Sequence, residues 1–446
     1  MGRYVLFSPI GMTDPTRGNY DGAFLHIMRH YRPEKAYLYM TKEVCRFDDK
    51  DNRYEIMAKK LQQFLGFSCE IIKIKDYQVD NPQDFEMFYK PFEKIINNII
   101  SDTSSKIIVN LSSGTPQIKN ACHTICAVSK RDMLTIQVLS PQGKANTEDT
   151  VKKDYDLNDE WENLFDNHSE LDPPNRCIEV AVRNYRAILS RETILKHLEA
   201  YDYNAALRVA EDNSFFLDKR VIHLIKAGAF RLALDFANAL EESEKGGYDG
   251  LFPVKSGDAA QIFEYLLLLS IKTRRREIAD FTRGISPLLF HMFRSFLHKR
   301  CKEDVIRYCT YNSSKDYYNL RAGKMPLDLL EHYNKYYNGL KQGDFKDGFL
   351  SASNMLPLIQ YKCNDGQAVR LAEELRNFED KARNAAAHKI IEISDEWLKD
   401  MTGMDSTEAL EKAKRFFLLI DSAYSKQADW NSYDYLNKEI EAQMRF

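Results

Sequence analysis

The sequence predicts a Rossmann-like α/β domain followed by helical domains, and two observations favour this fold class. Strand-like and helix-like patterns alternate through residues 1–172, and repeated β-α-β units form parallel sheets. A polar, acidic stretch then ends in Pro173-Pro174, which cannot continue a helix, and beyond it apolar residues recur at the three- and four-residue spacing of helices. We therefore expect three domains, at 1–172, 173–270 and 271–446.

In the first domain, short apolar runs alternate with amphipathic stretches of helical period. The runs predict strands at 5–10, 36–41, 69–74, 107–111 and 134–139, and the stretches between them predict helices at 20–31, 56–65, 85–100 and 116–129. In the second domain the helical spacing covers 178–189, 205–210, 221–225, 230–240 and 262–271. Helices are expected to continue through the third domain.

The composition excludes several classes of protein. With 446 residues, 44% hydrophobic and 29% charged, and a mean hydropathy of −0.49, the chain is neither a membrane protein nor a disordered one. The longest apolar stretch, Tyr265 to Ile271, is far shorter than the roughly 20 residues of a bilayer span. The N-terminus runs directly into a predicted strand, so we expect no secretory signal and a cytoplasmic protein.

Cysteine usage and net charge limit the chemistry further. The eight cysteines contain no C-x2-C pair, which argues against a zinc ribbon, an iron–sulfur site or a disulfide framework. We interpret the nearest approach, Cys122-His123-x2-Cys126, as reduced core residues. The net charge of −3 gives no global basic field, so any contact with nucleic acid must be local.

Two loops are expected at the carboxyl ends of the predicted strands, where parallel sheets bind ligands. One is Gly11 to Pro15, and the other is Ser112 to Gln117. In the second loop Thr115 is a good N-cap and Pro116 fits the first helical position, so backbone N–H groups and the helix dipole would favour an anion such as phosphate. The alternatives to a ligand site are an ordinary helix cap for the second loop and an ordinary turn for the first. The candidate binding residues are Gly11, Thr13, Asp14, Ser112, Ser113, Gly114, Thr115 and Gln117.

A second group of candidates, Arg383, Asn384 and His388, lies in the C-terminal helices. Asn384 and His388 share a helix face, whereas Arg383 and His388 are about 140° apart, so one copy is half a site. Two copies across a two-fold axis would surround one phosphodiester. Histidine can exchange a proton with a ribose 2′-hydroxyl and arginine can stabilise the phosphorane charge, which predicts RNA cleavage without a metal ion. Arg191 and His197 have a similar spacing, but Glu192 follows that arginine and favours a solvated helix face.

Together the two groups resemble one family, the CARF-HEPN ribonucleases that accompany type III CRISPR systems, known as the Csm6 family. The resemblance rests on Gly11 to Pro15, Ser112 to Gln117, and the Arg383, Asn384 and His388 motif. It implies that 1–172 is a CARF sensor for a cyclic oligoadenylate made by the CRISPR effector complex, with cyclic hexa-adenylate favoured over tetra-adenylate.

The resemblance also implies that 271–446 is a HEPN domain that degrades single-stranded RNA in antiviral defence, and that 173–270 links the two domains. A homodimer is implied, with no cofactor, no metal, no membrane and no stable DNA binding. A secondary cleavage of the activator by the N-terminal domain stays open.

Two alternatives come from other classes of protein. A ligand-responsive transcription regulator could use the same sensor, but the strongest basic cluster, Lys272 to Arg276, lacks a convincing helix-turn-helix around it. A non-catalytic helical interaction protein would need neither Arg383 nor His388.

Overall fold

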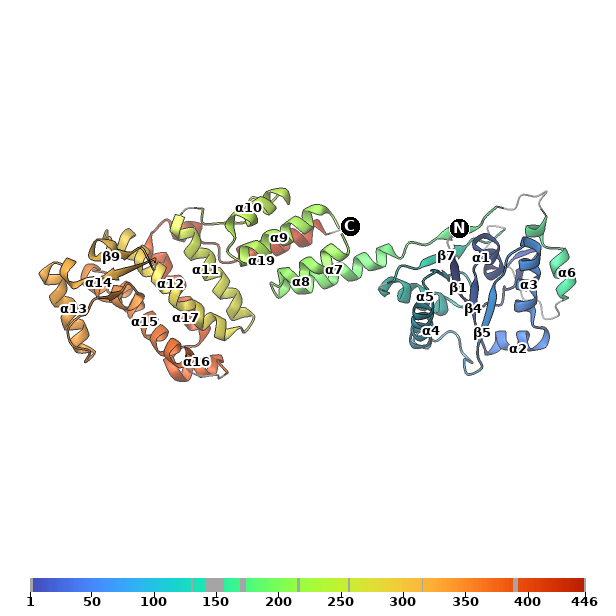
Figure 1. Cartoon of the computed structure of the whole chain (residues 1–446), viewed down its shortest axis with the longest axis horizontal. Helices are drawn as coiled ribbons and strands as arrows, with labels where there is room; N and C mark the ends of the chain where they lie inside the picture. Colours follow the sequence, from blue (N-terminus) through green and yellow to red (C-terminus); the bar gives the residue numbers. More distant parts are fainter. Residues whose placement is uncertain are drawn as a thin grey trace. The chain divides into compact units, whose positions relative to one another are not determined.

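The protein is described from a computed structural model that covers residues 3–129, 131–141, 156–168, 174–214, 217–255, 257–314, 316–387 and 392–444. The chain divides into two compact units, 1–189 and 190–446, which are described separately (Figure 1). No helix in the described part of the chain is long and apolar enough to cross a bilayer.

A six-stranded sheet forms the centre of the N-terminal unit, in the order β5-β4-β1-β6-β7-β8. The first five of these strands are parallel and β8 is antiparallel to β7. They are β1 (Tyr4–Pro9), β4 (Lys35–Thr41), β5 (Glu70–Asp76), β6 (Lys106–Asn110), β7 (Leu134–Val138) and β8 (Cys177–Glu179). A short hairpin of β2 (Thr16–Arg17) and β3 (Tyr20–Asp21) follows β1.

Helices cover both faces of this sheet (Figure 1). They are α1 (Ala23–Tyr31), α2 (Lys42–Asp51), α3 (Arg53–Leu65), α4 (Tyr89–Asp102), α5 (Pro116–Val128) and α6 (Leu157–Glu162). Because side chains alternate along a strand, Leu6 of β1 joins the core beneath α1 and α3, and Phe7 joins the core beneath α4 and α5. The central strands are therefore buried on both faces, which explains their nearly continuous apolar sequences.

The five predicted strands of the first domain are confirmed, but two of the predicted helices begin later than expected. The helix expected at 178–189 begins only at Arg183, because residues 177–179 add β8 to the sheet beyond the proline pair. The helix expected at 20–31 begins at Ala23, since Tyr20 and Asp21 pair with β2 and Gly22 precedes the helix. The sequence analysis also missed α2 and α6.

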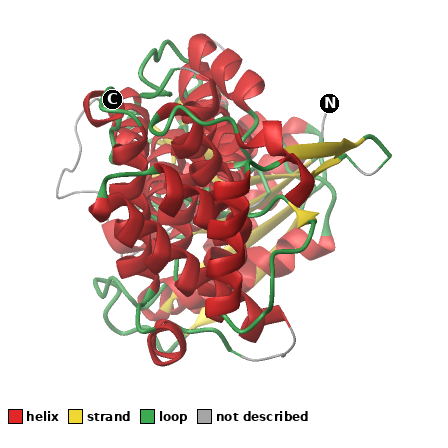
Figure 2. Ribbon diagram, turned by 90° about the vertical axis from the view of Figure 1, so that its left-hand side faces the viewer, coloured by secondary structure: helices red, strands yellow, loops and turns green. Residues whose placement is uncertain are grey.

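The C-terminal unit is mostly helical (Figure 2). Its helices are α7 (Arg183–Glu199, which starts in the first unit), α8 (Tyr203–Asp212), α9 (Lys219–Leu232), α10 (Phe236–Lys245), α11 (Gly257–Arg274), α12 (Ile278–Lys299), α13 (Leu327–Gly339), α14 (Ala352–Lys362), α15 (Gly366–Ala387), α16 (Asp395–Thr402), α17 (Ser406–Ile420), α18 (Tyr424–Gln427) and α19 (Ser432–Gln443). A small antiparallel sheet of β9 (Cys309–Asn312), β10 (Tyr317–Leu320) and β11 (Gly348–Phe349) was not expected from the sequence.

One apolar core runs through the whole C-terminal unit. The buried side chain of Arg231 joins α9 to two later helices: it forms an ion pair with Glu264 of α11 at 2.7 Å and donates to the Ser432 hydroxyl of α19 at 2.8 Å. The ring of Tyr433 stacks under the same guanidinium at 4.0 Å. Removing one partner of such a buried ion pair typically costs about 3–5 kcal/mol. The hydrogen bond from Arg231 to Ser432 joins segments that are 201 residues apart in the sequence.

Helices α12 and α15 pack against each other in antiparallel orientation. Phe281, near the start of α12, meets Phe378 with 6.3 Å between ring centroids. Arg300, just after the end of α12, forms an ion pair with Asp365 before α15 at 3.8 Å. The second half of α15 therefore packs against the N-terminal end of α12.

Candidate functional site

The two predicted loops meet at the carboxyl edge of the sheet. Strand β1 lies between β4 and β6, and the chain fills the β4 side before it crosses to β6. This reversal of strand order is the place where open α/β sheets bind ligands. The loop that begins with Gly11 after β1 and the loop that begins with Ser112 after β6 consequently lie side by side, as the sequence predicts.

Two glycines allow the loops to touch. A Cβ atom on Gly11 would lie 2.7 Å from the backbone nitrogen of Gly114, closer than any side chain permits. Gly114 itself has φ +84°, a left-handed conformation, and a Cβ there would lie 2.9 Å from Ile118. Both predicted binding glycines are thus required by the backbone geometry of the loop pair.

Asp14 is buried and directs its carboxylate into the first loop. Its oxygens accept hydrogen bonds from the backbone nitrogens of Gly11 at 2.9 Å and Phe24 at 3.1 Å. Burial raises the pKa of Asp14, against the opposing effect of these bonds and of one from the Ser113 side chain. The carboxylate therefore holds the loop in shape, and a direct contact between Asp14 and a ligand stays a prediction. Thr13, the neighbouring candidate, is half-buried.

Asn110, which the sequence analysis did not select, organises the second loop. This fully buried side chain donates to Ser8 at 2.9 Å and to Ser113 at 3.0 Å, and it accepts from the backbone nitrogen of Ser112 at 2.8 Å. The hydroxyl of Ser112 accepts from the Val138 nitrogen at 2.6 Å. These serines are thereby committed to strands β1, β6 and β7. The sequence signal that could have identified Asn110 is a polar residue inside an otherwise apolar, buried strand.

The start of α5 has the predicted cap. The Thr115 hydroxyl accepts from the Ile118 nitrogen at 3.4 Å and donates to the Pro82 carbonyl at 2.6 Å, with Pro116 at the first helical position. The side-chain oxygen of Gln117 is buried and has no hydrogen-bond partner among the described residues. An unsatisfied acceptor of this kind favours a polar ligand or water at the loop.

A positive charge that the sequence analysis missed lies one turn into α5. Lys119 is half-buried, and burial together with the nearby charge of Arg17 lowers its pKa, which Asp14 partly offsets. A lysine ammonium and the N-terminal amides of a helix on the same edge favour an anionic ligand.

The second candidate site is described in part. Arg383 is exposed near the end of α15, directly after the buried Ala382. The backbone of Asn384 continues the helix, while its side chain and the whole of His388 lie outside the described residues. The distance between Arg383 and His388 therefore stays a prediction.

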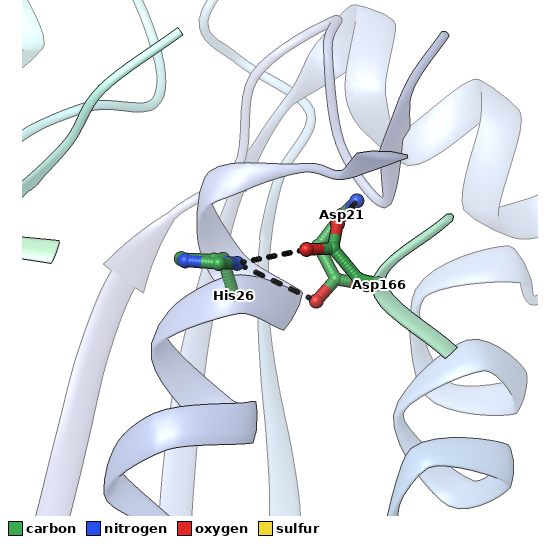
Figure 3. A group of neighbouring side chains, drawn as sticks. All are labelled: Asp21, His26 and Asp166. Carbon is green, nitrogen blue, oxygen red and sulfur yellow. Dashed lines mark hydrogen bonds and ion pairs between the residues drawn. The ribbon is translucent and has the colours of Figure 1, made fainter. Parts of the chain in front are cut away.

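A third cluster, around His26, is part of the framework of the N-terminal unit. Its Nδ1 faces the carboxylates of Asp21 at 3.6 Å and Asp166 at 3.8 Å (Figure 3). Arg29 donates to Asp21 at 3.0 Å, and Arg176 lies 3.3 Å from Asp166 and donates its backbone N–H to His26 Nε2. Two guanidinium groups neutralise the two carboxylates, so the chemistry of the cluster suits a buried ion-pair network and opposes a dication.

Comparison with known families decides what the two units are. Three family models match successive parts of the chain: the Cas_Csm6 CARF domain over residues 68–177, the Csm6 6H domain over 180–232, and the Cas_Csm6 HEPN domain over 251–441. This chain belongs to the Csm6 family. The resemblance drawn from the loop and helix motifs is confirmed, and the matched CARF and HEPN regions contain Ser112 to Gln117 and Arg383 to His388, respectively.

Curated Csm6 proteins match over nearly the full chain. The CRISPR system endoribonuclease Csm6 of Mycobacterium tuberculosis is 28% identical over 439 residues, which is 98% of this chain and 97% of that protein. The endoribonuclease Csm6 of Enterococcus italicus is 25% identical over 449 residues, or 97% of each chain. A solved structure of Enterococcus italicus Csm6 bound to cyclic hexa-2′-fluoro-hexa-dAMP has the same fold, with a TM-score of 0.73, 18% identity, and 99% and 100% of the two chains covered.

The hydrogen bonds of Asn110 lead to a testable expectation for the two loops at the sheet edge. Asn110→Ala removes three hydrogen bonds, two of them buried, so it is expected to lower the stability of the N-terminal unit by about 2–3 kcal/mol. Hydrogen exchange of the β1 and β6 amides measures this change. Asn120→Ala is the control, because its bond to Tyr89 is exposed, and it should cost less than about 0.5 kcal/mol. Equal losses of stability in Asn110→Ala and Asn120→Ala would contradict the role assigned to the Asn110 hydrogen bonds.

Proposed function

We propose that this Csm6 protein is a cyclic oligoadenylate-activated endoribonuclease of CRISPR antiviral defence, and that it cleaves single-stranded RNA without a metal ion. One observation carries the proposal: relatives named CRISPR system endoribonuclease match the chain from end to end, and the HEPN match includes the Arg383 to His388 motif. We assign the regions 1–172, 173–270 and 271–446 to sensing, linking and cleavage.

The proposed chemistry assigns one role to each motif residue. His388 acts as the general acid–base for a ribose 2′-hydroxyl that attacks the adjacent phosphate, and Arg383 stabilises the negative charge that develops there. Asn384 orients the phosphate that is attacked. The 5′-oxygen is the leaving group and takes up a proton. Because Arg383 and His388 are about 140° apart on an ideal helix, the proposal includes a homodimer in which two motifs form one site.

The proposed activator site is the pair of loops at the sheet edge. The buried acceptor of Gln117, the nearby Lys119 and the capped start of α5 support an anionic ligand with hydrogen-bonding groups. The solved relative carries a cyclic hexanucleotide analogue, and we propose cyclic hexa-adenylate over tetra-adenylate for this chain. Secondary cleavage of the activator by the N-terminal unit, and action in the cytoplasm, belong to the same proposal.

The first functional test concerns the chemistry of cleavage. Activity is expected to persist in excess EDTA and to leave 2′,3′-cyclic phosphate ends, since the 2′-hydroxyl is the nucleophile. His388→Ala and Arg383→Ala should each lower the rate at least ~100-fold, measured with a fluorogenic RNA. His197→Ala is the control and should be near neutral. Products with 3′-hydroxyl ends, or an inactive His197→Ala protein, would show that the assignment is wrong.

The second functional test concerns activation. Gly114→Val places a branched side chain against Ile118 in a left-handed backbone position. The ratio of cleavage rates with and without cyclic hexa-adenylate is expected to fall to about one, because the loop can no longer hold the ligand. Gly66→Val is a matched control, since Gly66 also has a positive φ (+67°) but faces open space. Normal activation of Gly114→Val, or equal loss in both variants, would contradict the proposed site.

A further inference from the structure

Two cysteines of the C-terminal unit that the proposed function does not use lie in contact. Cys301 follows the end of α12, and Cys363 follows the end of α14. The Cys301 thiol donates a hydrogen bond to the Cys363 side chain, and the Cys363 thiol donates in turn to the Asp365 carbonyl, with 3.8 Å between sulfur and oxygen. The two sulfur atoms are therefore neighbours, although the residues are far apart in the sequence.

Two ion pairs hold the segments that carry these cysteines in register. Arg300 pairs with Asp365 at 3.8 Å, and Lys362 pairs with Glu303 at 2.9 Å. The two segments run in opposite directions, so the ion pairs lie on either side of the cysteine pair. The contact between the thiols is consequently fixed by the fold and does not depend on the rotation of one side chain.

The backbone of each cysteine is tied to the helix that precedes it. The Cys301 N–H donates to the Phe296 carbonyl at 3.2 Å, and the Cys363 N–H donates to the Ile359 carbonyl at 2.9 Å. A disulfide requires two cysteines whose side chains point toward each other from neighbouring backbone segments. Two thiols in contact, each on a fixed helix end, meet this requirement.

Exposure distinguishes this pair from a second one. Cys122 and Cys126 of α5 are also neighbours, but both are buried and both belong to one helix. Cys301 and Cys363 are half-buried, so a small molecule in solution can reach them. A bond between them would join the ends of two different helices.

The two thiols differ in their surroundings. Burial, with a smaller contribution from Cys363, raises the pKa of Cys301 to about 12. Cys301 therefore remains a thiol at neutral pH. Because the thiolate is the attacking species in thiol–disulfide exchange, we assign the first attack to Cys363.

We propose that Cys301 and Cys363 are a redox-modification site, at which a small disulfide such as oxidised glutathione converts the two thiols into a disulfide. Cys363 loses its proton and attacks one sulfur of the oxidant, whose S–S bond breaks and releases one glutathione. Cys301 then loses its proton and attacks the Cys363 sulfur of the mixed disulfide, which releases the second glutathione. Two protein thiols are oxidised and one oxidant disulfide is reduced to two thiols, so electrons and protons balance.

The new bond would close the segment between residues 301 and 363, which contains the sheet of β9 to β11 together with α13 and α14. A cross-link of this kind restricts the unfolded chain, so the oxidised protein should melt at a temperature roughly 5 °C higher than the reduced protein. Dithiothreitol should reverse the change. The inference does not depend on the proposed endoribonuclease function.

Thiol mapping of the full-length wild-type protein tests the site directly. The protein is incubated with oxidised glutathione, denatured, and alkylated with N-ethylmaleimide. Mass spectrometry should find six of the eight cysteines alkylated and one digest fragment in which Cys301 and Cys363 are linked within a single chain. Alkylation of all eight cysteines, a lasting glutathione adduct on Cys363, or a cross-link between two chains would overturn the inference.

Serine variants assign the rise in melting temperature to this bond. Cys301→Ser and Cys363→Ser should each abolish the rise, and Cys301→Ser should keep glutathione attached to Cys363. Cys177→Ser is the matched control, because Cys177 is also half-buried, and it should retain both the disulfide and the rise. A rise that persists in Cys301→Ser, or one that is lost in Cys177→Ser, would contradict the assignment.

Discussion

The close approach of two backbone segments at the carboxyl edge of the sheet is the constraint on which the proposed sensor site depends. Gly11 and Gly114 leave no room for a Cβ atom between the loops that follow β1 and β6. Asp14 fixes one loop from inside, and Asn110 fixes the other to its neighbouring strands. The residues at the surface of this edge can then present backbone N–H groups, Gln117 and Lys119 in a fixed arrangement.

The inner and outer residues of these loops have different roles. The buried groups, Asp14, Ser113 and Asn110, satisfy one another and determine the shape of the loops. The groups with unused hydrogen-bonding or charge capacity, Gln117 and Lys119, are those that a ligand can recruit.

The sequence was sufficient to predict the parallel sheet, the two loops at its carboxyl edge and the family, because strand alternation, helix caps and loop positions are local signals. It was not sufficient for Asn110 or for the inward orientation of Asp14, since both depend on partners from neighbouring loops or strands that only the fold brings together. The strand at 177–179 was mistaken for a helix because its pairing with β7 overrides a short apolar pattern.

The central claim is that a cyclic oligoadenylate at the sheet edge controls RNA cleavage by the HEPN region. The most direct measurement is the initial rate of fluorogenic RNA cleavage by the wild-type protein alone and with cyclic oligoadenylates of four, five or six units. An allosteric coupling of about 1–3 kcal/mol predicts that cyclic hexa-adenylate raises the rate roughly 5- to 150-fold, with smaller effects of the other rings. Equal rates with and without every ring would contradict the account.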